Sequence, residues 1–540
     1  MLKKQPEHLR RDLVNAEQAL ARQEFDTCIR LCDGVLELDA INLPAHLFRG
    51  VASGQVGQFE RAVRDLSWVV EQQPENTQAA FFLGQALRRS GMPDAALGQL
   101  KPLLENPQLR QQALFETAMC LDRLDRVSQS IDYYKLLLSE NPRHADSAAN
   151  LSALLERSGQ LDKALAWADR ALLHAPGNIT SLLTQARVLR RQGVPARAEH
   201  LLRDLLQRNP GPNTRVIALN QLGQCLDRQQ RYPEAFEAFR EANEVQKAHD
   251  PEALVDDYAS YGRELVLFLR QWLQGNPPGD WSPTPPDDRE APVFLVGFPL
   301  SGATVLAEAL ARHPRVEVIE EKELLLEVRR KWMSADHYDR VPRMSPDEIA
   351  EARRQYRLAQ AAARRNPEAT VVVDKLPLNS VYLHLIYRLF PEARVVQVLR
   401  DPRDTCLACY FQTFQLVGAM PYFLELGSTV DYYDAVMSLA NQALDVLPLQ
   451  VQTVRYESLV ADPDAELQAL EEFLGISEKG AVIEDPYAAE RGAGDAAPPR
   501  ANEPGYPRLA EHWRNYSSQL EPYVPKLQPW VERFGYGSRE

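Results

Sequence analysis

The sequence contains little cysteine and no excess of positive charge. Six cysteines in 540 residues are too few for a disulfide scaffold. Two pairs have helical spacing, Cys28 with Cys32 and Cys406 with Cys409, but no second CxxC or histidine pair completes a zinc site. We therefore expect reduced, buried thiols and no metal. Asp and Glu (75) outnumber Lys and Arg (61), giving a formal net charge of −14, which disfavours a nucleic-acid-binding protein because such proteins need a basic surface.

Long hydrophobic runs are also missing. The first residues, MLKKQPEHLRRD, include no apolar core of a signal peptide, and no stretch approaches the roughly 18 apolar residues that cross a bilayer. We therefore expect a cytoplasmic protein without a membrane span. A chain of 540 residues is too long for one core, so we expect roughly two to four domains.

The first half of the chain has an internal period of 34 residues. Small residues recur at this interval, at Ala62, Ala96, Ser130, Ala164 and Ala198, with Ala235 after a further 37 residues. Turn glycines such as Gly57 and Gly91, and prolines such as Pro142 and Pro176, follow the same step. On the first helix of each period a second small slot is occupied, as at Gly50, Gly84, Ala186 and Gly223. Each period therefore predicts two helices that approach closely at the small positions. In its period and in these positions the segment resembles the tetratricopeptide repeat (TPR).

This resemblance implies an α-solenoid over residues 1–250, in which about seven repeats, residues 7 to 247, stack into a superhelix. Such a superhelix has a concave face suited to an extended peptide or a partner helix. We therefore expect a peptide or protein partner in this groove. The alternative is that the repeats are a purely structural spacer.

Residues 251–291 separate the repeats from a region with a different pattern. Residues 252 to 274 have the apolar spacing of one more amphipathic helix, which would cap the last repeat, and residues 276 to 292 have the proline-rich composition of a linker. Over residues 292–540, helical patterns alternate with short apolar runs, namely PVFLVGF, VEVIE, TVVVDKL, ARVVQVLRD and QVQTVRY. The alternation predicts an α/β domain with a parallel sheet, whose sites lie at the carboxyl ends of the strands.

The loop after the first run predicts an anion site. Its sequence, PLSGAT over residues 299–304, joins a strand directly to a helix, whose first N–H groups have no partner within the helix. Gly302 permits close approach of the backbone, and Ser301 and Thr304 add hydroxyl donors. The arrangement is P-loop-like, but the lysine of a Walker A motif is absent, so ATP or GTP chemistry is disfavoured.

Two further strand ends carry groups suited to anions, DKLPLN from Asp374 and LRDPRD from Leu399. Together with PLSGAT, HPRVEVIEEK, VRYESLV and WVERFGYG they resemble the sulfotransferase superfamily. The greatest likeness is to bacterial TPR-sulfotransferases, and a more remote one is to tyrosylprotein sulfotransferases. The resemblance covers residues 292 to 536. It implies metal-free transfer of a sulfuryl group from the nucleotide co-substrate 3′-phosphoadenosine 5′-phosphosulfate (PAPS) to a hydroxyl or amine.

The resemblance also implies roles for individual residues. Glu321, with Glu320 beside it, would be the general base, and Lys375 would be the cation that assists transfer. The alternative for the two glutamates is that they cap a helix or face solvent. The residues implied for PAPS binding are Leu300, Ser301, Gly302, Ala303, Thr304, Arg400, Ala408, Arg491 and Gly492. We expect structural roles for His313 in a turn, for Arg403 with Asp404 as a pair at a helix start, and for Tyr456 with Glu457 at the floor of the cleft.

The sequence departs from the family pattern at ligand-binding positions. Leu300 stands where the family loop has Arg or Lys, Ala303 replaces a hydroxyl, and Ala408 stands where the family has Ser. Removing one charge-assisted hydrogen bond from a buried anion site costs roughly 1.5–3 kcal/mol. Two functions therefore stay open. One is an active sulfotransferase whose TPR region presents a peptide, protein or glycan acceptor, and the other is a pseudo-sulfotransferase that acts as a TPR interaction scaffold.

Overall fold

The computed structural model describes residues 7–250, 261–287, 289–333, 338–476 and 510–537. By its internal contacts the chain divides into two compact units, Met1–Val188 and Leu189–Glu540, and each is described by itself. Within the described ranges, no helix combines the length and the apolar composition that crossing a membrane requires. All six cysteines are buried and form no disulfide bond, as predicted.

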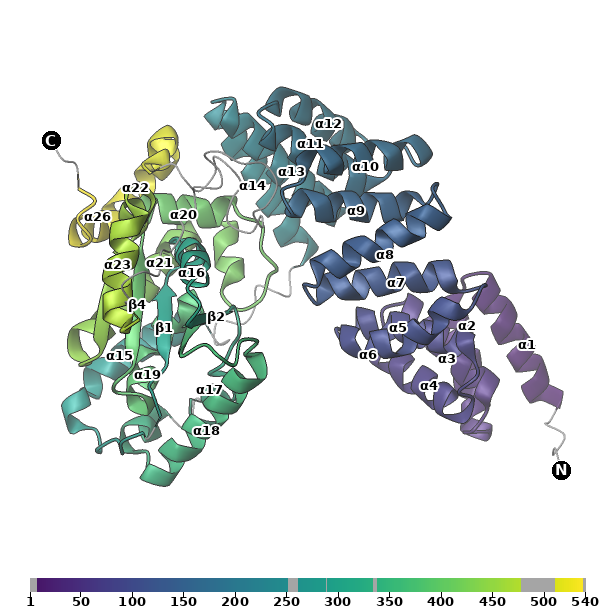
Figure 1. Cartoon of the computed structure of the whole chain (residues 1–540), viewed down its shortest axis with the longest axis horizontal. Coiled ribbons are helices and arrows are strands. Elements are labelled where there is room, and N and C mark those ends of the chain that lie inside the picture. Colours follow the sequence, from purple (N-terminus) through teal and green to yellow (C-terminus); the bar gives the residue numbers. More distant parts are fainter. Residues whose placement is uncertain (1–6, 251–260, 288, 334–337, 477–509, 538–540) are drawn as a thin grey trace. The chain divides into compact units, whose positions relative to one another are not determined.

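The first unit consists of repeat helices, coloured purple to blue in Figure 1. Consecutive helices pair as the 34-residue period predicts, α1 with α2, α3 with α4, and so on to α9 with α10. In chain order they are α1 (Glu7–Ala21), α2 (Phe25–Leu38), α3 (Leu43–Gln55), α4 (Phe59–Gln72), α5 (Thr77–Arg89), α6 (Pro93–Leu100), η1 (Lys101–Glu105), α7 (Arg110–Arg123), α8 (Val127–Glu140), α9 (Ala145–Arg157), α10 (Leu161–His174) and α11 (Ile179–Arg191), which runs into the second unit.

The small positions of the period lie where two helices touch. A Cβ added to Gly50 would lie 2.7 Å from Leu66 Cγ, and one added to Gly84 would lie 2.7 Å from Leu100. Because interiors are close-packed, a larger side chain at either position would push the helices apart. The helix pairing predicted from the period is therefore confirmed, and with it the TPR solenoid.

Buried ion pairs join the first helices of successive repeats in this unit. Arg88 Nε on α5 donates to Glu116 Oε2 on α7 at 2.6 Å, and Arg187 Nε on α11 donates to Glu156 Oε2 on α9 at 3.1 Å. Both glutamates are more than nine-tenths buried. A buried carboxylate is costly without such a partner, so these pairs fix the stacking of one repeat on the next.

The second unit begins with the last helices of the repeats, α12 (Pro195–Gln207), α13 (Pro212–Arg228) and α14 (Tyr232–His249). The repeats therefore continue across the division between the units. The next helix, α15 (Arg263–Gly275), covers the second half of the helix predicted over residues 252–274 and ends one residue later; residues 252–260 lie outside the described part of the chain. It packs along α21 (Leu426–Val446) of the α/β domain.

Two buried arginines fix the proline-rich segment that follows α15. Arg388 donates to the carbonyl of Ser282 at 2.6 Å, and Arg353 donates to the carbonyls of Pro285 and Pro286 at 2.9 and 3.2 Å. Proline has no N–H group, so a proline-rich segment cannot satisfy its carbonyls by regular secondary structure. The segment predicted as a linker is thus bound along the α/β domain.

Five strands form one sheet in the order β2-β3-β1-β4-β5, and every pair of neighbours is parallel. The strands are β1 (Val293–Gly297), β2 (Val316–Glu320), β3 (Val371–Lys375), β4 (Arg394–Leu399) and β5 (Gln450–Arg455). Each lies within one of the five predicted runs, so the predicted parallel sheet is confirmed. Because all strands run the same way, their carboxyl ends share one edge.

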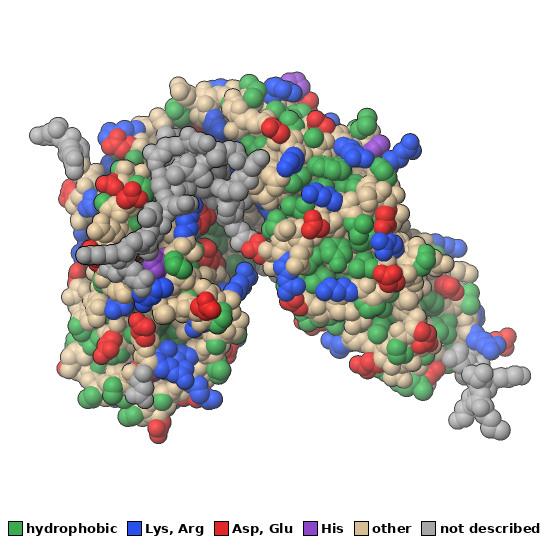
Figure 2. Space-filling model, in the orientation of Figure 1, with side chains coloured by type: hydrophobic (Ala, Val, Ile, Leu, Met, Phe, Trp, Pro, Cys, Tyr) green, Lys and Arg blue, Asp and Glu red, His purple; other side chains and the backbone are tan. Residues whose placement is uncertain are grey.

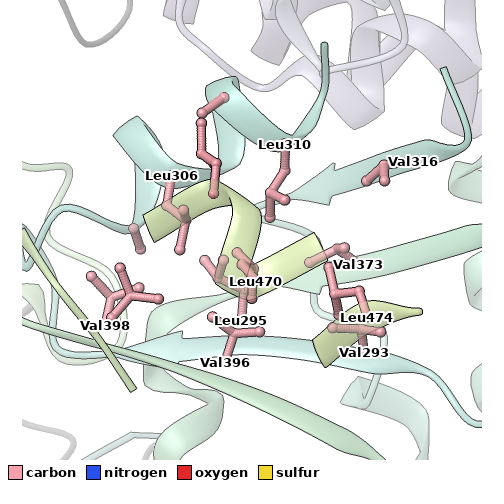
Figure 3. Packing of buried hydrophobic residues seen from close by; sticks show 14 of the residues in the cluster. Val293, Leu295, Leu306, Leu310, Val316, Val373, Val396, Val398, Leu470 and Leu474 are labelled. Carbon is pink, nitrogen blue, oxygen red and sulfur yellow. The ribbon is translucent and has the colours of Figure 1, made fainter. Parts of the chain in front are cut away.

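Helices cover both faces of this sheet. In chain order they are α16 (Ala303–Leu310), α17 (Leu326–Trp332), η4 (Tyr338–Arg343), α18 (Pro346–Ala363), η5 (Pro377–Tyr382), α19 (Leu383–Leu389), α20 (Pro402–Phe411), η6 (Met420–Leu424), α21, α22 (Tyr456–Ala461), α23 (Pro463–Leu474), η7 (His512–Tyr516), α25 (Ser517–Leu520) and α26 (Val524–Arg533). On one face Leu306 of α16 and Leu470 of α23 pack around Leu295 of β1, as Figure 3 shows. Successive strand side chains point to opposite faces, so Phe294 meets Tyr356 of α18 on the other face.

Candidate functional site

The loop between β1 and α16 forms a backbone cradle at the carboxyl edge of the sheet. Leu300 and Gly302 have φ of +61° and +101°, and Gly302 is the last residue before α16. A Cβ added to Gly302 would overlap the ring of Tyr456, so this position requires glycine. The first N–H groups of α16 have no partner within the helix and lie at its positive end. The loop predicted from PLSGAT therefore has the geometry of an anion site.

The side chains of this loop differ in what they offer a ligand. Ser301 Oγ is buried and has no hydrogen-bond partner within the described ranges. Thr304 Oγ1 accepts a hydrogen bond from Lys375 Nζ at 3.0 Å. Ala303 is buried on the first turn of α16, and the side chain of Leu300 is 38% exposed. The loop thus presents backbone amides, one unused hydroxyl and an exposed hydrocarbon.

Lys375 stands at the end of β3 and is 2% exposed. Its Nζ lies 2.6 Å from Glu321 Oε1 and 3.4 Å from Glu320 Oε2. Both carboxylates are half exposed, so a buried cation reaches the edge of solvent between two acids and the hydroxyl of Thr304. The structure therefore brings together the proposed base, the proposed cation and the start of α16.

The sheet itself aligns these groups. Glu320 is in register with Lys375 across the β2–β3 pair, and the N–H of Glu321 donates to the carbonyl of Lys375 at 2.9 Å. Glu321 has φ of +52°, in the left-handed region where non-glycine residues are uncommon. This turn of the backbone directs the adjacent carboxylates toward one ammonium. Their meeting depends on strand pairing, which residue spacing alone does not specify.

Sequence reasoning assigned no role to Asp374, the residue before Lys375. Its carboxylate is fully buried, and it accepts hydrogen bonds from the Tyr356 hydroxyl at 3.2 Å and from Asn379 Nδ2 at 3.4 Å. Burial raises the pKa of Asp374 to about 7. The only sequence signal is an acid that ends the apolar run VVVD, which is unusual for a buried strand.

Arg400 follows β4 and lies against the cradle. Its Nη1 donates to the carbonyl of Leu300 at 3.3 Å, and its guanidinium lies 5.0 Å from the centre of the Tyr456 ring. The side chain is 6% exposed, and Nε has no hydrogen-bond partner among the residues that the structure describes. A buried guanidinium with an unused donor is suited to an anion. Tyr456, expected at the floor of the cleft, lies beneath both Gly302 and Arg400.

The start of α20 differs from the predicted pairing. Arg403 forms its ion pair with Asp401, at 2.6 Å, and not with Asp404 as expected from the sequence. Asp404 instead accepts the backbone N–H groups of Glu511 and Trp513, at 2.9 and 2.7 Å. Burial raises the pKa of Asp404 to about 6. The helix start therefore holds the segment around η7, a contact between residues more than 100 positions apart in the chain.

The remaining predicted residues lie further from the cradle or cannot be placed. Ala408 is part of α20 and is partly exposed, and His313 lies in a turn, where its Nδ1 accepts the N–H of Arg315. Glu457 accepts the N–H of Asp401 and the Tyr536 hydroxyl, as suits a structural residue. Arg491 and Gly492 lie outside the described residues.

The unused donors in and around the cradle suit an anionic ligand. Besides Ser301 Oγ and Arg400 Nε, the buried Thr405 Oγ1 on α20 has no partner within the described part of the chain. Buried polar groups without partners are rare and point to a ligand or water. In the same part of the chain, no group of three His, Cys, Asp or Glu side chains is arranged to hold a metal ion.

Comparison with known proteins identifies two kinds of sequence in the chain. Residues 292–479 match the model of the sulfotransferase family. Residues 49–100, 83–143, 123–179 and 183–251 match the model of the tetratricopeptide repeat.

Three curated relatives have similar identities to the chain. An uncharacterized protein of Aquifex aeolicus (strain VF5) is 26% identical over 327 residues, 58% of this chain and 42% of its own length. Protein-tyrosine sulfotransferase 2 of Gallus gallus is 26% identical over 203 residues, 35% of this chain and 53% of its own length. Nodulation protein NoeE of Sinorhizobium fredii (strain NBRC 101917 / NGR234) is 26% identical over 227 residues, 35% of this chain and 51% of its own length. The chain therefore spans about half the length of these relatives.

Proposed function

Because the chain carries a sulfotransferase-family domain and tetratricopeptide repeats, we propose that it transfers a sulfuryl group from PAPS to a hydroxyl or amine acceptor. The observation that carries this proposal is the position of Lys375. A buried ammonium lies within hydrogen-bonding distance of Thr304 at the start of α16 and of Glu321 at the end of β2. One site therefore combines a cradle for a phosphate, a cation beside it and a carboxylate open to solvent.

Binding of PAPS is assigned to the loop of residues 300–304 and to Arg400. The amides at the start of α16, the unused Ser301 hydroxyl and the buried guanidinium of Arg400 are the donors available for anionic oxygens. PAPS, when bound, supplies a sulfuryl group on a phosphate leaving group. Sulfuryl transfer does not itself require a metal, because donors fixed at the site stabilise the charge that develops.

Glu321 and Lys375 have different roles in the transfer. The Glu321 carboxylate takes the proton of the acceptor hydroxyl or amine, whose oxygen or nitrogen forms the new bond to sulfur as the bond from sulfur to the phosphate oxygen breaks. Lys375 stabilises the negative charge on that phosphate oxygen. Its ammonium now donates toward Thr304 and the two glutamates, so turnover requires that one of these hydrogen bonds be exchanged for one to the phosphate.

The repeats are proposed to bring a peptide or protein to the site. Figure 2 shows hydrophobic side chains exposed over the middle helices of the first unit, around α7 to α10, with basic and acidic side chains interspersed. Leu136 on α8 and Leu173 on α10 are 41% and 75% exposed. The name of the Gallus gallus relative makes a tyrosine hydroxyl the first acceptor to test. We also propose a cytoplasmic location, which six buried cysteines that form no disulfide bond support.

A pseudo-sulfotransferase is the second candidate, and Leu300 is the observation that favours it. Its exposed hydrocarbon occupies the loop position at which the family resemblance calls for a cation. Such a protein would keep the fold and an adenosine 3′,5′-bisphosphate site but would act through its repeats.

Calorimetric titration with adenosine 3′,5′-bisphosphate, followed by transfer of labelled sulfate from PAPS to tyrosine peptides, separates these functions. We expect binding and transfer in the wild-type protein and tighter binding in Leu300→Arg, because a charge-assisted hydrogen bond is restored. Binding without transfer to any acceptor would favour the pseudoenzyme. No binding to either protein at sub-millimolar ligand would exclude the nucleotide assignment.

The two glutamates provide a matched test of the base. Glu321→Gln should lower the transfer rate by roughly 10²–10⁴-fold while leaving nucleotide affinity nearly unchanged, since general base catalysis contributes about that factor. Glu320→Gln, which changes the other carboxylate beside Lys375, is the control and should retain most activity. Normal turnover in Glu321→Gln would refute the assignment.

A further inference from the structure

Helix α20 has one end at the candidate site and the other end on the last TPR hairpin, α13–α14. It begins two residues after Arg400 and ends at Phe411, which at 1.5 Å per residue spans about 15 Å. Both α20 and the hairpin belong to the second compact unit. The helix is therefore a direct physical link between the repeats and the cradle.

Amide side chains of the hairpin cap the carboxyl-terminal end of α20. Asn220 of α13 donates to the carbonyl of Phe411 at 2.6 Å, and Asn243 of α14 donates to the carbonyl of Tyr410 at 3.0 Å. Gln246 of α14 donates to the carbonyl of Phe414, just beyond the helix, at 2.6 Å. The last carbonyls of a helix have no partner within it, so Asn220 and Asn243 supply hydrogen bonds that α20 cannot make itself, and Gln246 fixes the segment that follows.

Aromatic packing reinforces the same contact. The rings of Phe239 on α14 and Phe411 are stacked, with centroids 4.3 Å apart. Phe239 reaches this position because Gly223 of α13 leaves room for it, since a Cβ there would lie 2.7 Å from the ring. Gly223, a small position of the repeat period, therefore also determines where the Phe239 ring packs against α20.

Helix α20 and the residue shortly before it also contact the cradle loop. The thiol of Cys409, in the last turn of α20, donates to the carbonyl of Pro299, 3.3 Å away, and Arg400, two residues before the helix, donates to the carbonyl of Leu300. The unused hydroxyl of Thr405 lies on the first turns of the same helix. A displacement of α20 would therefore move two groups assigned to the anion site, the guanidinium of Arg400 and the hydroxyl of Thr405.

A second contact ties the hairpin to η7. Asp227 of α13 is 5% exposed, accepts a hydrogen bond from the Tyr516 hydroxyl and lies 3.0 Å from His512 Nε2. The segment of η7 is also held by Asp404 of α20. The hairpin therefore contacts both elements that meet at the start of α20.

We propose that the last TPR hairpin is a positioning part of the nucleotide site, with Asn220, Asn243 and Gln246 as the residues that hold α20 in register with the cradle. The inference rests on the proposed function, because it takes the cradle as the site of PAPS. It follows by linkage that nucleotide binding and the conformation of the hairpin are coupled with equal strength in both directions. A partner that binds this hairpin would thereby change the affinity of the site.

The test uses the full-length protein and adenosine 3′,5′-bisphosphate. Asn220→Leu and Asn243→Leu keep the branching of each side chain but remove its donor, and the double variant should bind the nucleotide about tenfold more weakly, because carbonyls of α20 lose their partners. Glu237→Gln is the control, since Glu237 is exposed on α14, the helix that carries Asn243, and pairs with Arg240. It should bind like the wild type.

Hydrogen exchange of the wild-type protein supplies a readout that a purely structural contact would not change. Saturating nucleotide should slow amide exchange in α13 and α14, and the double variant should lose this protection. Binding by the wild type without protection of α13–α14, or unchanged affinity in the double variant, overturns the positioning role while the proposed function stands. Absence of any nucleotide binding to the wild type would overturn both.

Discussion

The repeat helices and the α/β domain both bury charged side chains, but they satisfy them differently. In the first unit a buried arginine meets a buried glutamate on the next repeat, as Arg88 meets Glu116. In the α/β domain the buried Lys375 meets carboxylates that are half exposed, and the buried Asp374 accepts hydrogen bonds from two neutral groups, the Tyr356 hydroxyl and the Asn379 amide. In the repeats the buried charges therefore pair with each other, whereas at the sheet edge of the α/β domain they are available to a ligand.

This difference indicates which charges serve the fold and which serve a ligand. A buried pair whose members satisfy each other gains nothing from a ligand, and breaking it leaves an uncompensated charge. A buried cation whose partners face solvent can exchange them for an incoming anion at little cost, because exposed ion pairs contribute little. Perturbed and incompletely paired groups cluster at functional sites for this reason.

The largest expected effect is that of Lys375→Met on transfer. Removal of a group that stabilises charge in the transition state lowers the rate by about 10²–10³-fold. The free energy of unfolding should change by less than about 1 kcal/mol, because the carboxylates left behind are exposed. Labelled-sulfate transfer and urea unfolding measure the two effects. A loss of several kcal/mol with activity retained would show that Lys375 is structural, like the arginines of the repeats.

Arg88→Met should reverse this pattern. We expect a loss of about 3–5 kcal/mol in the unfolding of the first unit, because Glu116 would keep a buried charge without its cation. The double variant Arg88→Met/Glu116→Leu is the control and should regain most of that loss, since no unpaired charge remains. Equal destabilisation in the single and double variants would contradict this account. Urea unfolding monitored by circular dichroism measures both.

Asp374 gives the stability of the α/β domain a dependence on pH. Burial raises its pKa in the folded protein to about 7 from 3.8, so the folded state binds the proton more tightly than the unfolded state. The free energy of unfolding therefore falls as pH rises between these values, by at most about 1.4 kcal/mol per pH unit for one proton. Asp374→Asn removes this term, so it should gain stability relative to the wild type from pH 4 to pH 8.

Unfolding of both proteins across that pH range measures the effect. A difference between wild type and Asp374→Asn that stays constant with pH would show that the carboxyl does not titrate in this window. His384 contributes a pH dependence of the opposite sign, because burial lowers its pKa to about 3, but this contribution is common to both proteins and cancels from their difference.

The sequence predicts the features of both regions that depend on local spacing. The 34-residue period predicts the helix pairs because a small residue at each step is needed for close packing, as Gly84 against Leu100 shows. The five apolar runs predict the five strands, since strands buried on both faces are continuously apolar. The cradle follows from one glycine between a strand and a helix.

Contacts that depend on the tertiary structure cannot be predicted from local residue spacing. Arg403 pairs with Asp401 and not with its neighbour Asp404, because Asp404 is turned toward the backbone of Trp513. In the sequence Asn243 is one polar residue of a repeat helix, and only the folded chain shows that it donates a hydrogen bond to the carbonyl of Tyr410. Both depend on segments that are more than 100 residues apart in the sequence.

The smallest expected effect compares two glycines of the repeats. One lies at a position that the period keeps small, and the other does not. Gly84→Ala should cost about 1–3 kcal/mol, because its Cβ would overlap Leu100 and overpacking strains a core. Gly34→Ala on α2 should instead stabilise by about 0.5–1 kcal/mol, because no atom lies within 4 Å of its Cβ and alanine favours the helix. Thermal unfolding of the two variants should therefore shift in opposite directions. A loss of stability in both would show that glycine in these helices serves backbone flexibility, and the close approach at Leu100 would no longer explain the period.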